Sequence, residues 1–253
     1  RELIGGSAAA VITVEKLTYG SSTATLASIA GHPRHVFEQI DICRPEAVER
    51  LFQEHRPDAV LHLAAETHVD RSIGTPWPFV ETNVNGTYVL LEAARAYWSA
   101  LEGEPSARFR FLHVSTDEVY GSLGPAGAFT EESPLRPNSP YSASKAASDH
   151  LVRAWHHTYG LPVLTTHCSN NFGPFQHPEK LIPVLIANAV RGNPLPVYGA
   201  GDNVRDWLFV EDHVSALVRV ASAGKPGETY DIGAGTERST LDMAKAVCAI
   251  LDE

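Results

Sequence analysis

The sequence predicts an α/β protein built on a doubly wound parallel sheet, and three observations lead to this prediction. Short β-type runs alternate with helical stretches long enough to cross a sheet, which is the pattern of βαβ units. The runs 59–64 and 109–114 contain few charged residues, as expected of strands covered on both faces. After Cys168 proline and glycine become dense, so a smaller mixed α/β lobe is expected beside the sheet.

The elements follow one another in a regular order. We expect strands over 11–14, 35–40, 59–64, 109–114 and 163–168, and helices over 45–55, 79–100, 140–159, 179–191, 211–222 and 240–252. The first six residues have the composition of a helix end. We place one domain at 1–172 and the lobe at 173–253, with 203–232 partly returning to the first domain.

Composition excludes several classes of function. The 253 residues are 43% hydrophobic, enough for a sizeable core, and carry a formal net charge of -10 with no basic run, which argues against nucleic acid or membrane surfaces as partners. No apolar stretch approaches the about 20 residues of a membrane span. Three scattered cysteines without CxxC spacing predict neither a disulfide framework nor a metal site, and they suit a reducing cytoplasm.

Tyr141 and Lys145 form the most informative pair. Ser139-Pro140 is a helix-start signal, and the spacing of four then places both side chains on one helix face. An ammonium beside a phenol favours phenolate and is expected to lower the tyrosine pKa, giving a base that takes a hydroxyl proton as hydride leaves the same carbon. The alternative is a packed tyrosine beside a solvated lysine.

A second cluster, Ser115-Thr116-Asp117-Glu118, directly follows the strand 109–114. Ligands bind at the carboxyl ends of strands in open α/β sheets. Adjacent carboxylates repel each other's charge, so one would stay protonated as an acid while the other acts as a base. The alternative is an ordinary acidic helix cap or turn.

Glu15 closes the run 11–14, at the place where Rossmann-type domains have an acid for the ribose hydroxyls of NAD. The phosphate-cradling glycine loop is missing, because no GxGxxG or GxxGxxG occurs in the sequence. The central strand that precedes such a loop is missing too. We therefore expect these residues to be a piece of a longer chain.

Together these segments resemble the extended short-chain dehydrogenase/reductase superfamily and, within it, the dTDP-glucose 4,6-dehydratase family. Tyr141-Ser142-Ala143-Ser144-Lys145 matches the superfamily motif YxxxK, and Thr116-Asp117-Glu118 matches the narrower dehydratase mark. Further matches are 63–72, Asn170-Asn171-Phe172-Gly173-Pro174, 178–183 and 203–207.

The resemblance implies an NAD-dependent lyase that converts dTDP-glucose to dTDP-4-keto-6-deoxyglucose in deoxysugar biosynthesis. Tyr141, assisted by Lys145, would take the proton of the 4-hydroxyl while C4 gives hydride to NAD⁺, with Thr116 bonded to the 4-oxygen. Glu118 would remove the C5 proton, Asp117 would protonate the departing 6-hydroxyl, and C6 would receive the hydride back. The family further implies a homodimer formed through two helices, including the one that bears Tyr141.

The same resemblance implies the binding residues. The expected NAD site comprises Glu15, Lys16, Leu17, Thr18, Asp41, Ile42, Leu63, Ala64, Ala65, Thr67, Thr82, Tyr141, Lys145 and Asn171. The expected nucleotide-sugar site comprises Thr67, Thr116, Asn170, Lys180, Leu181, Pro196, Val197, Tyr198 and Arg205. Arg205 would bind the diphosphate through its planar donors; the alternative is a surface ion pair with Asp202 or Asp206.

Two positions depart from the family pattern: Glu15 stands where many members have Asp, and Thr240 where Asn is common. Two other functions stay open at this point. An NAD-dependent epimerase or decarboxylase of the same fold would leave Asp117 and Glu118 without a role, and a non-catalytic nucleotide-sugar-binding remnant would account for the missing glycine loop.

Overall fold

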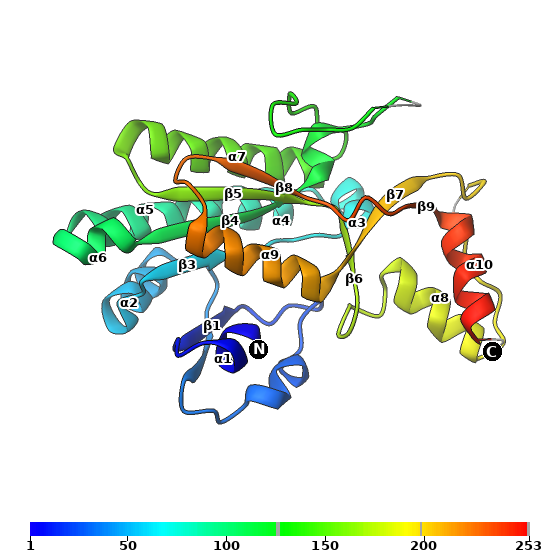
Figure 1. Cartoon of the computed structure of the whole chain (residues 1–253), viewed down its shortest axis with the longest axis horizontal. Helices are drawn as coiled ribbons and strands as arrows, with labels where there is room; N and C mark the ends of the chain where they lie inside the picture. Colours follow the sequence, from blue (N-terminus) through cyan, green and yellow to red (C-terminus); the bar gives the residue numbers. More distant parts are fainter. Residues whose placement is uncertain (125–126, 198, 252–253) are drawn as a thin grey trace.

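The computed structural model describes residues 1–124, 127–197 and 199–251. Its central sheet has four parallel strands in the order β3-β4-β5-β8 (Figure 1). These strands are β3 (Ala59–His62), β4 (Arg110–Thr116), β5 (Val163–Cys168) and β8 (Thr229–Ile232). The predicted strands at 59–64, 109–114 and 163–168 are confirmed, with ends that differ by one or two residues.

Helices cover both faces of this sheet. α2 (Pro45–His55), α5 (Thr87–Ser99) and α7 (Pro140–Tyr159) belong to the layer on one face, and α9 (Val210–Ala223) covers the other (Figure 1). Leu112 and Leu164 in neighbouring strands pack against Leu217 and Val220 of α9. Burying each such leucine contributes about 1.5–3 kcal/mol. The predicted doubly wound α/β fold is confirmed.

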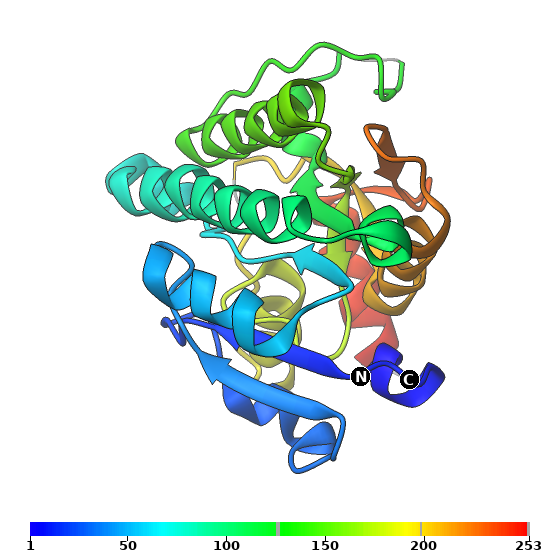
Figure 2. The same cartoon turned by 90° about the vertical axis from the view of Figure 1, so that its left-hand side faces the viewer.

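A second pair of parallel strands, β1 (Val11–Glu15) and β2 (His35–Gln39), lies beyond β3 (Figure 2). Among the described residues, neither strand hydrogen-bonds to the four-stranded sheet. The side chain of Arg34 fixes the start of the chain to this pair by donating to the carbonyls of Ile4, Ser7 and Ala9.

The long helix α7 begins as its local sequence predicts. Ser139 and Ser142 form a capping box, Pro140 occupies the first turn, and Gly160 ends the helix at a left-handed φ of 77°. Tyr141 and Lys145 therefore lie one turn apart at the start of a well-capped, 20-residue helix.

The predicted helix over 79–100 is confirmed, with a π-helical turn in its interior. The segment is divided into α4 (Trp77–Phe79), a π-helical turn η2 (Val80–Gly86) and α5. In the π turn, Thr87 Oγ1 donates to the carbonyl oxygen of Asn83 at 2.6 Å, while the Asn83 side chain bonds outside its helix. Periodicity along the sequence does not reveal the tertiary bond of Asn83 to the Glu66 carbonyl, and π turns of this kind are frequent at functional sites.

The lobe after Cys168 contains a mixed sheet and two packed helices. β7 (Val204–Phe209) pairs parallel with β6 (Asn170–Phe172) and antiparallel with β9 (Glu237–Ser239). α8 (Leu181–Val190) packs on α10 (Thr240–Leu251). The strands β6, β7, β8 and β9 were not predicted. β6 and β9 are three residues long, and β7 and β8 interrupt their apolar residues with charged ones.

The remaining elements are short: α1 (Glu2–Gly6), η1 (Thr23–Ile29), α3 (Val69–Gly74), α6 (Gly103–Arg108) and η3 (Asp117–Tyr120). α1 confirms the helical character of the first six residues. None of the helices in the described part of the chain combines the length and apolarity that crossing a membrane requires.

Candidate active site

The predicted site residues gather at the carboxyl edge of the parallel strands. β3, β4 and β5 lie in parallel register, with Thr116 opposite Cys168 at the last position. The segments that leave these strands therefore emerge side by side, at the edge where open α/β sheets bind ligands.

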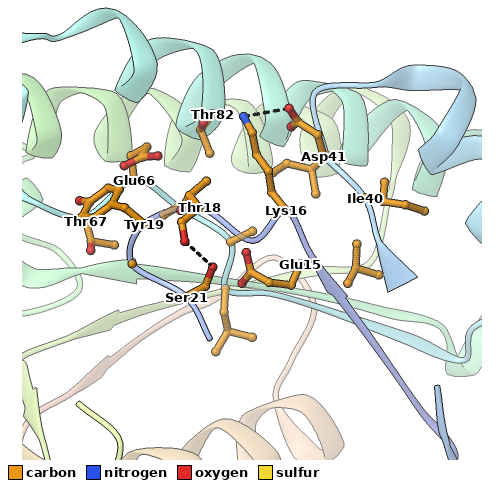
Figure 3. A pocket seen from close by; sticks show the side chains of 16 residues that line it. Glu15, Lys16, Thr18, Tyr19, Ser21, Ile40, Asp41, Glu66, Thr67 and Thr82 are labelled. Carbon is orange, nitrogen blue, oxygen red and sulfur yellow. Dashed lines mark hydrogen bonds and ion pairs between the residues drawn. The ribbon is translucent and has the colours of Figure 1, made fainter. Parts of the chain in front are cut away.

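A cleft that is open to solvent lies where β1, β2 and β3 end (Figure 3). Ten residues predicted for the NAD site line it: Glu15, Lys16, Thr18, Asp41, Ile42, Leu63, Ala64, Ala65, Thr67 and Thr82. Glu66, inside the predicted 63–67 segment, lines it too, and five further residues were missed: Val14, Tyr19, Gly20, Ser21 and Ile40. Their positions next to predicted members were the available signal.

One end of the cleft is polar. Lys16 Nζ lies 2.8 Å from Asp41 Oδ2 (Figure 3). Burial opposes ionisation of Asp41, but its bonds to Lys16 and to the Cys43 N–H outweigh burial and lower its pKa. Glu15 Oε1 accepts the N–H of Leu17 at 3.0 Å, and Leu17 itself has a left-handed φ of 60°. The carboxylate of Glu15 is thus fixed at the wall of the cleft.

Four residues of the predicted NAD set do not line this cleft: Leu17, Tyr141, Lys145 and Asn171. The side chain of Asn171 instead forms hydrogen bonds within the protein. Its amide nitrogen donates to the Ser169 carbonyl, and its oxygen lies 2.7 Å from Nδ1 of His213. The side chain is occupied in holding β6 against α9, a contact that spacing along the sequence does not reveal.

The second group of predicted residues surrounds Tyr141. This side chain is only 8% exposed, and its backbone N–H donates to Ser72 Oγ. Burial and the nearby charges of Glu118 and Asp117 raise the pKa of Tyr141, while the neighbouring Thr116 hydroxyl lowers it to a smaller extent. The structure therefore brings Tyr141, Thr116, Asp117 and Glu118 together, as predicted.

The predicted direction for the Tyr141 pKa was wrong for the chain by itself. Lys145 was expected to lower it, yet the net shift is upward. Lys145 lies on the same helix as expected, but its ammonium donates to the Val114 carbonyl at 3.0 Å and is buried. Loss of water around the phenol is the largest cause of the upward shift in the pKa of Tyr141, and the charge of Glu118 is the next.

Asp117 and Glu118 differ in the charges that surround them. Burial first, and then the charge of Glu118, raise the pKa of Asp117 to about 6. Burial also raises the pKa of Glu118, but two cations, Arg205 and Lys180, oppose that shift. Asp117 therefore has a large upward shift of its pKa, and Lys180 gives Glu118 an additional cation that favours its ionised form.

Lys180 connects the lobe to the sheet. Its Nζ donates to the carbonyl of Thr67, in the segment after β3, at 3.3 Å. Its positive charge also acts to lower the pKa of Glu118. Arg205 is exposed on β7, and within residues 1–124, 127–197 and 199–251 it forms no ion pair with Asp202 or Asp206. Asp206 instead accepts the backbone N–H groups of Ala234 and Thr236.

The other predicted sugar-site residues lie along the lobe. Asn170 begins β6 beside β7, Leu181 begins α8, and Pro196 and Val197 lie in the segment that follows α8. Tyr198 lies outside the described residues. Val197 contacts the turn at Gly201, where an added Cβ would meet its Cγ1 at 2.7 Å.

Asn83 is a structural residue of the site that the sequence analysis missed. It is 1% exposed, and its amide exchanges two hydrogen bonds with the backbone of Glu66 while donating to Ser144 Oγ at 2.8 Å. One side chain thus joins the cleft wall after β3 to the helix that carries Tyr141.

Comparison with known proteins identifies the family. The model of the GDP-mannose 4,6 dehydratase family matches residues 3–253. The dTDP-glucose 4,6-dehydratase of Neisseria meningitidis serogroup B is 56% identical over 254 residues, which is 100% of this chain and 72% of that protein. The corresponding protein of Xanthomonas campestris pv. campestris is 60% identical over 96% of this chain and 69% of its own length.

The chain belongs to the dTDP-glucose 4,6-dehydratase family. Solved structures of the family have the same fold. The dTDP-glucose 4,6-dehydratase of Bacillus anthracis in complex with NAD matches with a TM-score of 0.90 and 42% identity over 100% of this chain and 76% of that one. The enzyme of Streptomyces venezuelae, with NAD and TYD bound, matches at 0.92 with 44% identity over 99% and 76%.

The raised pKa of Asp117 in this dehydratase-family chain predicts a pH-dependent stability cost. Below its ordinary pKa of 3.8 the group is protonated in both folded and unfolded chains. Between 3.8 and about 6 the folded chain alone keeps the proton, so stability falls as pH rises through this window. Asp117→Asn should therefore raise the free energy of unfolding by about 1–3 kcal/mol at about pH 8 and by little near pH 4.

Urea denaturation at the two pH values measures this difference. Asp58→Asn, at an exposed acid next to β3, is the matched control and should change stability by less than about 0.5 kcal/mol at either pH. Equal stability of the Asp117→Asn and parent proteins at the higher pH would contradict the burial of an ionisable acid.

Proposed function

We propose that this chain carries out the NAD-dependent conversion of dTDP-glucose to dTDP-4-keto-6-deoxyglucose, the reaction of a hydro-lyase. The observation that carries the proposal is the half-buried pair Asp117 and Glu118 beside Tyr141, two carboxyl groups whose pKa values are both raised and which face different charges. Eliminating water from a sugar requires one acid and one base close together, whereas an oxidation alone requires neither carboxyl group.

NAD⁺ supplies the oxidising chemistry when bound, accepting a hydride from C4 of the sugar and later returning it to C6. The residues of the cleft fit its adenosine end, since Glu15 offers a fixed carboxylate to ribose hydroxyls and Ala64 and Ala65 leave room at the wall. The acid at this place also repels the extra phosphate of NADP. The proposed cofactor site is the set given above for the cleft, with Tyr141 and Lys145 at its catalytic end.

The proton transfers are assigned to the residues around Tyr141. Tyr141 takes the proton of the 4-hydroxyl, and Thr116 donates a hydrogen bond to the same oxygen. Once C4 is a ketone, the C5–H is acidic and Glu118 removes its proton. Asp117, which holds its own proton to about pH 6, gives that proton to the departing 6-hydroxyl. Burial and the charge of Glu118 raise the pKa of Tyr141 in the chain alone. The mechanism therefore requires the bound reactants to offset these two effects.

The nucleotide sugar is proposed to lie between the sheet and the lobe. Lys180 and Arg205 both act electrostatically on Glu118, so cations suited to a diphosphate stand near the acid–base pair. We include Thr67, Asn170, Leu181, Pro196, Val197 and Tyr198 in this site from the family pattern. The domain division follows the same arrangement, with 1–172 for the cofactor and 173–253 for the sugar, and 203–232 returning through β8 to the central sheet.

An NAD-dependent epimerase is the main competing function, and a binding protein without turnover is the other. A UDP-glucuronic acid 4-epimerase of Bacillus cereus shares the fold, with a TM-score of 0.89 at 27% identity. The fold therefore does not separate the two activities. The carboxylate pair does, because inversion at C4 gives Asp117 and Glu118 no proton to move.

Incubation of the purified protein with dTDP-glucose and NAD⁺ tests the proposed function. We expect a 4-keto product that absorbs in alkali, with NADP⁺ unable to replace NAD⁺. Inversion at C4 would instead indicate an epimerase, and tight binding without turnover would indicate a binding protein. Asp117→Asn supplies the mechanistic arm: C4 oxidation, seen as reduced cofactor, should be slowed less than water loss, and equal loss of both would contradict the acid role of Asp117.

A homodimer formed through α5 and α7 is also proposed. An apolar hollow beside these helices is lined in part by Val80, Tyr88 and Leu151, and Trp77 at its rim is 67% exposed. Exposed apolar clusters of this kind are typical of protein interfaces. Free cysteines at 43, 168 and 248, together with the acidic composition, support a place in the cytoplasm, with neither nucleic acid nor membrane as partner.

Light scattering measures the assembly. We expect twice the 27.4 kDa mass of the chain, and Val80→Asp should shift the protein toward monomer by placing a charge in the hollow. Val190→Asp, at a 70% exposed valine of α8, is the matched control and should leave the mass unchanged. A monomeric parent protein would overturn the proposed dimer.

A further inference from the structure

A line of buried ionisable groups runs behind the helix that carries Tyr141. Asp149 of α7 has one carboxylate oxygen 3.1 Å from His113 Nε2 and the other 3.3 Å from His167 Nε2. The three side chains are between 0% and 6% exposed. The proton transfers assigned above use none of them, so this cluster has no role yet.

The line continues from His167 toward the surface. His167 Nδ1 lies 2.6 Å from the Tyr120 hydroxyl and 3.4 Å from Asp231 Oδ1, and Tyr120 donates to that same carboxylate at 2.8 Å. Burial opposes protonation of His167, but the two carboxylates outweigh burial and raise its pKa to about 9. The same two histidines hold the pKa of Asp149 well below its ordinary value against the effect of burial.

Lys145 lies at the other end of this line of ionisable groups, one helical turn before Asp149 on α7. Lys145 is 4% exposed, and burial lowers its pKa while the charge of Asp149 raises it. An ammonium that has lost its water needs a nearby anion to stay protonated. The Val114 carbonyl provides one hydrogen bond but no charge.

The other groups that face Lys145 do not provide that anion. His62 of β3 and His113 of β4 both have pKa values lowered by burial and by the lysine's own charge, so they are neutral near pH 7. Burial raises the pKa of the Cys168 thiol of β5 to about 11, so it stays protonated. On α7 itself, Tyr141 is neutral for the reason given above. Within the described residues, Asp149 is thus the anion that acts on Lys145.

We propose that Asp149, clamped between His113 and His167, is a positioning residue that keeps Lys145 protonated for the catalytic pair. The inference rests on the proposed function, in which Lys145 supports Tyr141. One carboxylate oxygen of Asp149 is hydrogen-bonded to His113 and the other forms an ion pair with His167. Asp149 therefore acts on Lys145, one helical turn away, through its charge. The charges then alternate from Lys145 through Asp149 and His167 to Asp231, so no buried charge lacks an opposite neighbour.

The pH profile of turnover in Asp149→Asn tests the proposal. Asparagine keeps the shape but removes the charge, so the pKa of Lys145 falls and its charge is lost at lower pH. The alkaline limb of kcat should therefore move down by about one pH unit or more, with activity recovered at the acid side of the limb. Ser148→Ala is the matched control, since Ser148 is a fully buried, uncharged neighbour bonded to the Lys145 carbonyl. The Ser148→Ala limb should not move.

An NMR titration separates this proposal from the proposed function and from a folding defect. In the parent protein His167 should remain an imidazolium at about pH 8, and in Asp149→Asn the Cε resonance of Lys145 should titrate at lower pH than in the parent. If His167 titrates at or below its ordinary 6.5, or if Asp149→Asn and Ser148→Ala move the limb equally, the proposal is overturned. If the parent protein is inactive but His167 and Lys145 titrate as expected, the proposed function is refuted while the role of Asp149 stands.

Discussion

The partial burial of two adjacent carboxyl groups at the end of β4 is the constraint on which the rest of the site depends. In water, Asp117 and Glu118 would both ionise and neither would serve as an acid at neutral pH. Burial makes ionisation of both groups costly. Arg205 opposes this effect at both, and Lys180 opposes it at Glu118 in addition. The difference between acid and base therefore arises from the surroundings of the pair.

The fold creates those surroundings with parts distant in sequence. Thr116 ends β4 and caps the short helix η3, which fixes where the two carboxyl groups point. Ser72 and Asn83 attach the start of α7 to the segment after β3, so Tyr141 is carried to the same edge. The lobe contributes two cations, Lys180 at the start of α8 and Arg205 on β7. A change in any of these contacts alters the distances on which the unequal ionisation depends.

Local signals in the sequence were sufficient for the parts of the site that depend on neighbours along the chain. Ser139-Pro140 marks the start of α7, and the strand before Thr116 places the carboxyl pair at a sheet edge. Contacts between distant segments were not accessible in this way. The π turn at Asn83, the use of Asn171 by His213, and the upward shift of the Tyr141 pKa all arise from packing that no spacing rule contains.

The carboxyl carbon resonances of Asp117 and Glu118, followed by NMR from about pH 4 to about pH 9, measure the central claim directly. The account predicts two separate steps, with Asp117 retaining its proton to about pH 6 and Glu118 ionising first. Ionisation of both groups in a single step within the ordinary carboxyl range would contradict it.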